Sequence, residues 1–192
     1  TEGLVAPIAR KALSDGVTLA IAESLTCGAL VNALGAGEDS VEWLAGGVVA
    51  YQTSTKVDVL GMDPGVDPCS AECALQLAVG VRELLRADVA VSTTGVGGPG
   101  ADGGHPAGTV FIGWASDREV GHRAFSFDGE PEQVLDQTVA VALRELLGQL
   151  EGDDVERLLV GDRDPLVGDH LLADRDLAEV ELDAADPALL AD

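Results

Sequence analysis

The feature that most constrains this chain is an apolar strand pattern that ends in a glycine-rich loop and resumes as a second strand. Residues 88–93 and 107–115 are short and apolar, which is typical of buried strands. Between them, residues 94–104 are rich in glycine, whose backbone N–H groups can come close to a bound anion. The pattern predicts a ligand site at a sheet edge, the alternative being a surface loop that binds nothing.

The same loop contains the spacing G-x-G-x-x-G at Gly95, Gly97 and Gly100. In dinucleotide-binding proteins this spacing opens a helix whose N-terminus lies under the pyrophosphate. Here Pro99 and a second glycine cluster follow, and then a strand pattern. The sequence therefore argues against a Rossmann-type dinucleotide site.

Helical and strand patterns alternate along most of the chain, which indicates an α/β sandwich with a mixed sheet. The clearest helix is 70–85, where apolar residues lie three and four apart, and Pro131 suits the first turn of a helix to about residue 150. Residues 37–40 are predicted to form a loop. The remaining helices are predicted at 2–14, 26–34 and 54–60, and the strands at 17–22, 46–51, 88–93, 108–115 and 119–127.

Composition divides the chain into a globular domain, residues 1–150, and an acidic extension, residues 151–192. The extension holds 14 acidic residues and three arginines. It also contains leucines, and the segment from Leu171 onward has the composition of an amphipathic helix. We expect it to be a solvated segment without catalytic residues that packs, if at all, on a neighbour.

The charge balance is strongly acidic, with 34 acidic residues against 11 basic ones and a net charge of −23. Such a chain repels nucleic acids and anionic membrane surfaces, so neither is expected as a partner. No apolar run is long enough to span a bilayer, and we expect a cytoplasmic protein. Acidic excess with only two lysines, Lys11 and Lys56, favours a halophilic source, the alternative being an acidic interaction protein.

The cysteines and histidines do not have the spacing of a metal site. Cys27, Cys69 and Cys73 include no C-x-x-C pair, and none of the three histidines supplies a matching ligand pattern. We therefore expect no metal and interpret the cysteines as small buried thiols.

Two further segments carry candidate chemistry. Residues 22–28 join a strand to a helix, where the hydroxyls of Ser24 and Thr26 can bind an anion or simply cap the helix. Residues 46–56 place Tyr51 five residues before Lys56. Because arginine holds nearly every other cationic position, and only lysine loses its proton when desolvated, Lys56 is a candidate for activating a hydroxyl nucleophile.

Thr94 and the glycine loop after it are the third candidate. Their backbone N–H groups have the character of an oxyanion hole or a phosphate cradle.

Three stretches of the chain, taken in order, resemble the CinA C-terminal domain family. They are Glu-Ser-Leu-Thr-Cys-Gly (23–28), Gly-Gly-Val-Val-Ala-Tyr (46–51) with Lys56, and Thr-Gly-Val-Gly-Gly-Pro (94–99) with Gly-Thr-Val (108–110). The resemblance covers roughly residues 5–150. It implies a three-layer α/β/α sandwich with a mixed, mostly parallel sheet, a homo-oligomer (dimer or trimer), and no metal or organic cofactor. The family is similar to nicotinamide-nucleotide amidase, which hydrolyses the carboxamide of nicotinamide mononucleotide to the acid and ammonia.

The resemblance also implies roles for individual residues. Tyr51 and Lys56 become the pair that activates a nucleophile, which is Ser40 or Ser24. The expected substrate pocket consists of Glu23, Ser24, Thr26, Thr94, Gly95, Gly97, Gly98 and Thr109.

The chain departs from the family pattern at several positions. The family has a serine where this chain has Val41, and arginines where it has Pro131 and Leu135. Two hypotheses are therefore open. The first is an amidohydrolase acting on nicotinamide mononucleotide. The second is a catalytically weak or inactive member that binds a small nucleotide and acts through oligomer or partner contacts.

Overall fold

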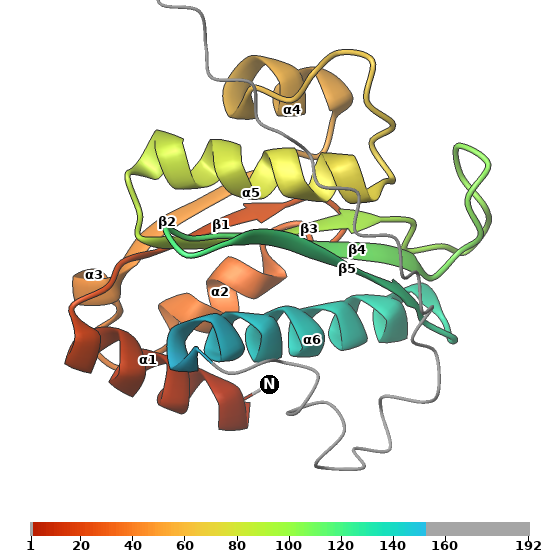
Figure 1. Ribbon diagram of the computed structural model, residues 1–192. Helices are drawn as coiled ribbons and strands as arrows, with labels where there is room; N and C mark the ends of the chain where they lie inside the picture. Colours follow the sequence, from red (N-terminus) through yellow and green to blue (C-terminus); the bar gives the residue numbers. More distant parts are fainter. Residues whose placement is uncertain (1, 153–192) are drawn as a thin grey trace, which may run out of the picture.

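The computed structural model describes residues 2–152 and shows a sheet covered by helices on both faces (Figure 1). Helices α1, α2 and α6 lie on one face, while α5 covers the other and α4 lies over α5. The helices are α1 (Glu2–Asp15), α2 (Ala29–Gly35), α3 (Ser40–Trp43), α4 (Thr53–Leu60), α5 (Ala71–Leu85) and α6 (Pro131–Glu151). The strands are β1 (Leu19–Glu23), β2 (Leu44–Val49), β3 (Val89–Gly95), β4 (Thr109–Ala115) and β5 (Val120–Ser126).

The five strands have the order β2-β1-β3-β4-β5. Strand β1 pairs in parallel with β2 and β3, whereas β4 is antiparallel to both β3 and β5. Four strands therefore run in one direction and only β4 runs against them. The predicted α/β/α sandwich with a mixed sheet is confirmed.

The chain leaves neighbouring strands toward opposite faces of the sheet. After β1 it turns to α2 on one face, and after β2 it turns to α4 and α5 on the other (Figure 1). In open α/β sheets, ligands bind outside the carboxyl ends of the strands at such a switch point. The topology alone therefore directs attention to the ends of β1 and β2.

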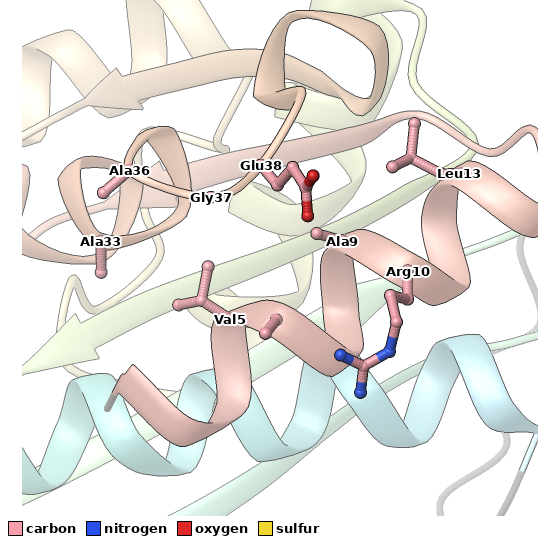
Figure 2. Close-up of a pocket in the computed structure, with 9 residues that line it drawn as sticks. Val5, Ala9, Arg10, Leu13, Ala33, Ala36, Gly37 and Glu38 are labelled. Atoms are coloured by element: carbon pink, nitrogen blue, oxygen red, sulfur yellow. The ribbon is translucent and has the colours of Figure 1, made fainter.

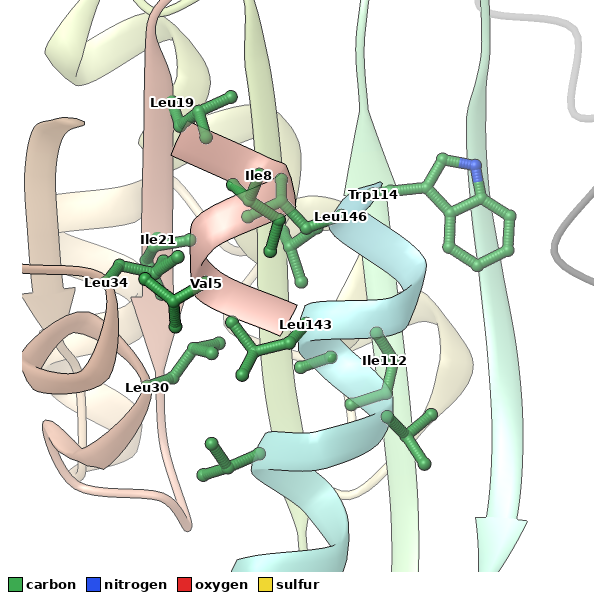
Figure 3. Close-up of a cluster of buried hydrophobic side chains, with 14 of the residues drawn as sticks. Val5, Ile8, Leu19, Ile21, Leu30, Leu34, Ile112, Trp114, Leu143 and Leu146 are labelled. Carbon is green, nitrogen blue, oxygen red and sulfur yellow. The ribbon is translucent and has the colours of Figure 1, made fainter. Parts of the chain in front are cut away.

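The two faces of the sheet are packed with side chains of different size. Leu19 and Ile21 of β1 point toward α1 and α6, where Ile8, Leu143 and Leu146 complete a core of large aliphatic residues (Figure 3). The alternate residues of β1 are alanines, and they face α5. Small residues on this face let α5 approach closely: a Cβ on Gly113 of β4 would lie 2.3 Å from the Ala74 carbonyl oxygen.

Most of the predicted elements are confirmed, including the helices around 54–60, 70–85 and 131–150. The predicted loop at 37–40 is confirmed except at its last residue, Ser40, where the short helix α3 begins. The predicted extension, residues 151–192, lies almost wholly outside the described residues. Within residues 2–152, none of the helices has the length and apolar character needed to cross a membrane.

A glycine in the middle of α5 sets how closely α4 packs on it. A Cβ on Gly80 would lie 1.9 Å from the Leu60 carbonyl oxygen at the end of α4. In an ordinary helix interior, Gly→Ala stabilises by ~1 kcal/mol. We expect Gly80→Ala to lower the free energy of unfolding by about 1–3 kcal/mol instead, because the backbones must separate. Urea unfolding in concentrated salt measures this.

The matched control is Gly3→Ala in α1, where an added Cβ would meet nothing within 4 Å. This variant should be as stable as the wild type or more stable by up to ~1 kcal/mol. Equal behaviour of the two variants would contradict the close approach of α4 to α5.

Candidate functional site

The candidate site lies at the carboxyl ends of β1, β2 and β3, and its centre is the buried amine of Lys56. Lys56 is on α4 and its side chain is only 2% exposed. Its Nζ donates to Ser24 Oγ at 3.0 Å, to the Ala50 carbonyl oxygen at 2.8 Å and to the Tyr51 carbonyl oxygen at 3.3 Å. The fold thus brings together two predicted catalytic residues, Lys56 and Ser24, that lie far apart in sequence.

The surroundings of Lys56 favour a neutral amine. Burial lowers the pKa of Lys56 from its ordinary value of 10.5, and only the nearby Cys73 thiol acts in the opposite direction. Among residues 2–152, no carboxylate forms an ion pair with this amine. A lysine without a counter-charge, next to a serine hydroxyl, has the arrangement needed for a proton acceptor.

Ser24 is fixed by backbone contacts directly after β1. Its N–H donates to the Thr93 carbonyl oxygen at 3.0 Å, and its own carbonyl oxygen accepts from Cys27 N–H at 3.1 Å. Its side chain is 8% exposed, so the hydroxyl lies just below the surface. Beside it, the hydroxyls of Thr26 and Thr93 form a buried hydrogen bond of 2.7 Å. Thr26 therefore contributes to holding this turn against β3.

Glu23, predicted as a substrate contact, forms hydrogen bonds within the fold. Its buried carboxylate accepts hydrogen bonds from the backbone N–H groups of Gly28 (2.9 Å), Leu30 (3.1 Å) and Val31 (2.8 Å). These are the otherwise unpaired donors at the start of α2. The helix predicted to be capped by Ser24 or Thr26 therefore begins only at Ala29, and the cap is Glu23.

Thr94, also predicted as a substrate contact, likewise forms contacts within the fold. Its hydroxyl donates to the Pro68 carbonyl oxygen at 2.5 Å and lies 3.9 Å from the Cys73 sulfur. Because its hydroxyl binds the Pro68 carbonyl, the buried Thr94 joins β3 to the loop before α5. The contact places Cys73 between Thr94 and Lys56, a position that sequence reasoning did not assign. The spacing of Cys73 with Leu77 and Val81 on the buried face of α5 could have indicated it.

The glycine loop is closed at its base by pairing between β3 and β4. Val96 N–H donates to the Thr109 carbonyl oxygen at 2.8 Å, and Gly108 N–H donates to the Val96 carbonyl oxygen at 2.8 Å. A Cβ on Gly95 would lie 2.3 Å from that Thr109 oxygen, which explains the glycine. Thr109 and Gly95 therefore form the support of the loop, whereas Gly97 and Gly98 lie beyond it and are half-buried.

Farther along the loop, His105 pairs with Asp67 at 2.7 Å. This pairing joins the glycine loop to the segment before α5.

Tyr51 contributes its backbone, and not its phenol, to the contacts of Lys56. The carbonyl oxygen accepts from Lys56, while the side chain is 67% exposed. A sequence pattern does not show which backbone carbonyl will contact a lysine. For this reason the contact between Lys56 and the Ala50 carbonyl was not predicted either.

The structure does not bring Ser40 to Lys56 within one chain. Ser40 begins α3, before β2, and its hydroxyl donates to the Gly35 carbonyl oxygen at 3.1 Å. Lys56 follows the other end of β2, and a strand of this length spans roughly 17–20 Å. Val41, where the family has a serine, is next to Ser40 and is 86% exposed.

The cysteines fall into two groups: Cys69 and Cys73 are buried, as predicted, and Cys27 is exposed. Burial raises the pKa of Cys69 to about 11 and also raises that of Cys73. Within the described part of the chain, histidine, cysteine and carboxylate side chains do not gather into a group of three that could hold a metal.

A cavity of about 340 Å³ lies elsewhere, between α1 and the segment from α2 to α3 (Figure 2). Small apolar residues line most of it, with Arg10 and Glu38 as the charged members. It contains none of the hydroxyl and amine groups of the switch point. The surroundings of Lys56 and Ser24 therefore remain the candidate functional site.

Comparison with known proteins agrees with the fold. Residues 1–150 match the family described as the CinA C-terminal domain. The protein YdeJ of Escherichia coli is 33% identical over 151 residues, which cover 76% of this chain and 88% of YdeJ. A crystal structure of a CinA superfamily protein from Escherichia coli superimposes with a TM-score of 0.74 at 33% identity, covering 77% of this chain and 89% of that one.

Several other curated relatives are much longer than the matched region. A CinA-like protein from Geotalea daltonii is 36% identical over 143 residues, which cover 70% of this chain but 35% of the relative. The chain thus spans about a third of the length of such relatives.

The capping role of Glu23 gives a stability prediction. Glu23→Gln replaces one acceptor oxygen with an NH₂ group that faces backbone donors at the start of α2. We expect the free energy of unfolding to fall by about 1–3 kcal/mol. The control is Glu72→Gln, at an exposed position in the first turn of α5, which should change the free energy of unfolding by less than ~0.5 kcal/mol. A small effect of Glu23→Gln would contradict the cap.

The lowered pKa of Lys56 predicts a pH dependence of stability. Below that lowered pKa, the folded protein buries a charged amine that the unfolded chain exposes to water. The full free-energy cost of burying the charge then lowers the stability of the folded protein. The penalty is relieved as the pH rises toward 10.5, where the unfolded chain also loses the proton. Wild type should therefore gain stability relative to Lys56→Met between the lowered pKa and pH 10.5. A constant difference across that range would contradict a desolvated amine.

Proposed function

The chain belongs to the CinA C-terminal domain family, and from this premise we propose that it hydrolyses the carboxamide of nicotinamide mononucleotide to nicotinate mononucleotide and ammonia. The observation that carries the proposal is the hydrogen bond of 3.0 Å between the buried Lys56 amine and the Ser24 hydroxyl. Amide hydrolysis needs a nucleophile, a base, and a proton donor for the departing ammonia. The substrate itself is taken from the family resemblance.

In the proposed reaction, neutral Lys56 takes the proton of the Ser24 hydroxyl while Ser24 Oγ bonds to the carboxamide carbon. The tetrahedral intermediate then expels ammonia, which receives its proton from the Tyr51 hydroxyl, and Lys56 restores that proton to Tyr51. An ester on Ser24 remains. Water, deprotonated by Lys56, hydrolyses this ester to the acid and frees the Ser24 hydroxyl.

This assignment requires the exposed Tyr51 side chain to turn over the site. Gly97 and Gly98 are the proposed source of backbone N–H donors for the developing oxyanion or for the substrate phosphate. Neither of them has a side chain that would obstruct a ligand.

A second candidate function is favoured by Val41, Pro131 and Leu135. An exposed valine cannot attack a carbonyl, and proline and leucine cannot pair with a phosphate. If those family positions are essential, the chain binds a small nucleotide without turning it over. Binding without ammonia release would then be the observed behaviour.

The test is ammonia release from nicotinamide mononucleotide in molar salt by the wild type, Ser24→Ala and Lys56→Met. We expect each variant to lose at least ~100-fold in kcat/KM, since nucleophile and base act as one unit. The matched controls are Ser14→Ala and Lys11→Met on the exposed surface of α1, which should stay within about twofold of wild type.

Ser40→Ala is a separate arm of this experiment. Unchanged activity would support Ser24 as the nucleophile, and a loss as large as that of Lys56→Met would instead assign Ser40. Folded wild-type protein that releases no ammonia but binds the nucleotide would support the second candidate function.

A further inference from the structure

Acidic side chains accompany the glycine loop that follows β3. Asp102 is in the loop, and its backbone pairs with that of His105. The ring of His105 in turn pairs with Asp67, an exposed residue in the segment before α5. The basic side chain of the loop therefore already has an anionic partner.

The loop also lies against the acidic start of α6. A Cβ on Gly98 would lie 3.5 Å from Pro131 Cγ. Glu130 and Glu132 flank this proline, and both are exposed. The Glu130 carboxylate accepts a hydrogen bond from the backbone of Gln133, so the first turn of α6 is already occupied by an anion of the chain.

Two other helices that begin at this edge of the sheet have an acid at their start. Glu23 accepts hydrogen bonds from the first residues of α2, and Glu72 is in the first turn of α5. A helix N-terminus ordinarily attracts phosphate, because its unpaired N–H groups and its dipole favour negative charge. Carboxylates of the chain take this place at α2, α5 and α6, whereas α4 has no acid in its first turn.

The arginines among residues 2–152 lie at other places in the fold. Arg82, near the end of α5, pairs with Asp117 in the turn between β4 and β5, and Arg118 is in the same turn. This turn is at the opposite edge of the sheet, beside the start of β3. Arg123 lies 3.6 Å from the buried carboxylate of Glu145 on α6. The others are Arg10 on α1, Arg86 after the end of α5, and Arg144, roughly 20 Å along α6 from Pro131.

We propose that the site prefers the carboxamide of the unphosphorylated nucleoside, nicotinamide riboside, over that of the mononucleotide. The preference rests on the proposed function and concerns which form of its substrate binds better. Both molecules have a cationic pyridinium ring, which the carboxylates around the loop attract. The phosphate of the mononucleotide adds a charge of roughly −1.5 to −2 at pH 7, which the same carboxylates repel. The N–H groups of Gly97 and Gly98 then serve the oxyanion of the amide.

The first test is calorimetric titration of Ser24→Ala, which lacks the proposed nucleophile, with the riboside and with the mononucleotide. At the lowest salt concentration that keeps the protein folded, we expect the riboside to bind at least ~10-fold more tightly. Because salt screens the carboxylates, added salt should weaken riboside binding and strengthen mononucleotide binding. Tighter binding of the mononucleotide, as a phosphate site at the start of α4 would give, overturns the proposal, and so does binding of neither molecule.

A double variant tests whether the acids around the loop cause the preference. Asp102→Asn with Glu132→Gln removes two exposed charges there and should reduce the affinity ratio at least ~3-fold. The matched control is Asp39→Asn with Glu83→Gln, two exposed positions before α3 and near the end of α5, which should leave the ratio within about 1.5-fold of its original value. Equal effects of the two double variants would overturn the proposal.

Ammonia release by the wild type separates this preference from the proposed function. A higher kcat/KM for the riboside than for the mononucleotide supports both. A higher kcat/KM for the mononucleotide would support the amidase and overturn the preference. Tighter binding of the riboside, without ammonia release from either molecule, would support the preference and contradict the amidase.

Discussion

The buried carboxylate of Glu23 holds the site in place. It ends β1 and accepts three backbone hydrogen bonds from the start of α2. These bonds replace the side-chain cap that a helix normally takes from the residue just before it. They also fix the tight turn that contains Ser24, so the position of the nucleophile candidate depends on a charge–helix interaction one residue away. Only a carboxylate supplies acceptors for all three donors.

Burying the amine of Lys56 in this site has a free-energy cost. A charged amine without a counter-ion is unfavourable in a buried position, and three oxygen acceptors compensate for only part of its lost hydration. The same cost lowers the pKa of the amine, because the neutral form avoids the lost hydration of the charge. In the proposed reaction, this loss of stability would be the counterpart of a reactive base.

Sequence patterns predicted the fold. The glycine loop and the rarity of lysine directed attention to the strand ends and to Lys56, where the structure places the amine beside Ser24. The patterns failed where backbone groups or long-range contacts decide the outcome: Glu23 caps a helix that begins six residues later, Thr94 binds the Pro68 carbonyl, and Tyr51 offers its carbonyl to Lys56. The resemblance also offered Ser40 as a nucleophile, yet the length of strand β2 separates it from Lys56. Only the three-dimensional path of the chain reveals that separation.

The contact of Gly80 with the end of α4 affects how Lys56 is held in position. Helix α4, which carries Lys56, approaches α5 through a backbone contact at Gly80, in addition to the packing of its side chains Leu60 and Val57. Substitutions in a core change how its side chains pack. A backbone contact of this kind has no side chain to change. The large aliphatic core lies on the opposite face of the sheet, so substitutions there do not touch this backbone contact. The packing of the larger core and the contact that positions Lys56 are therefore separated by the sheet.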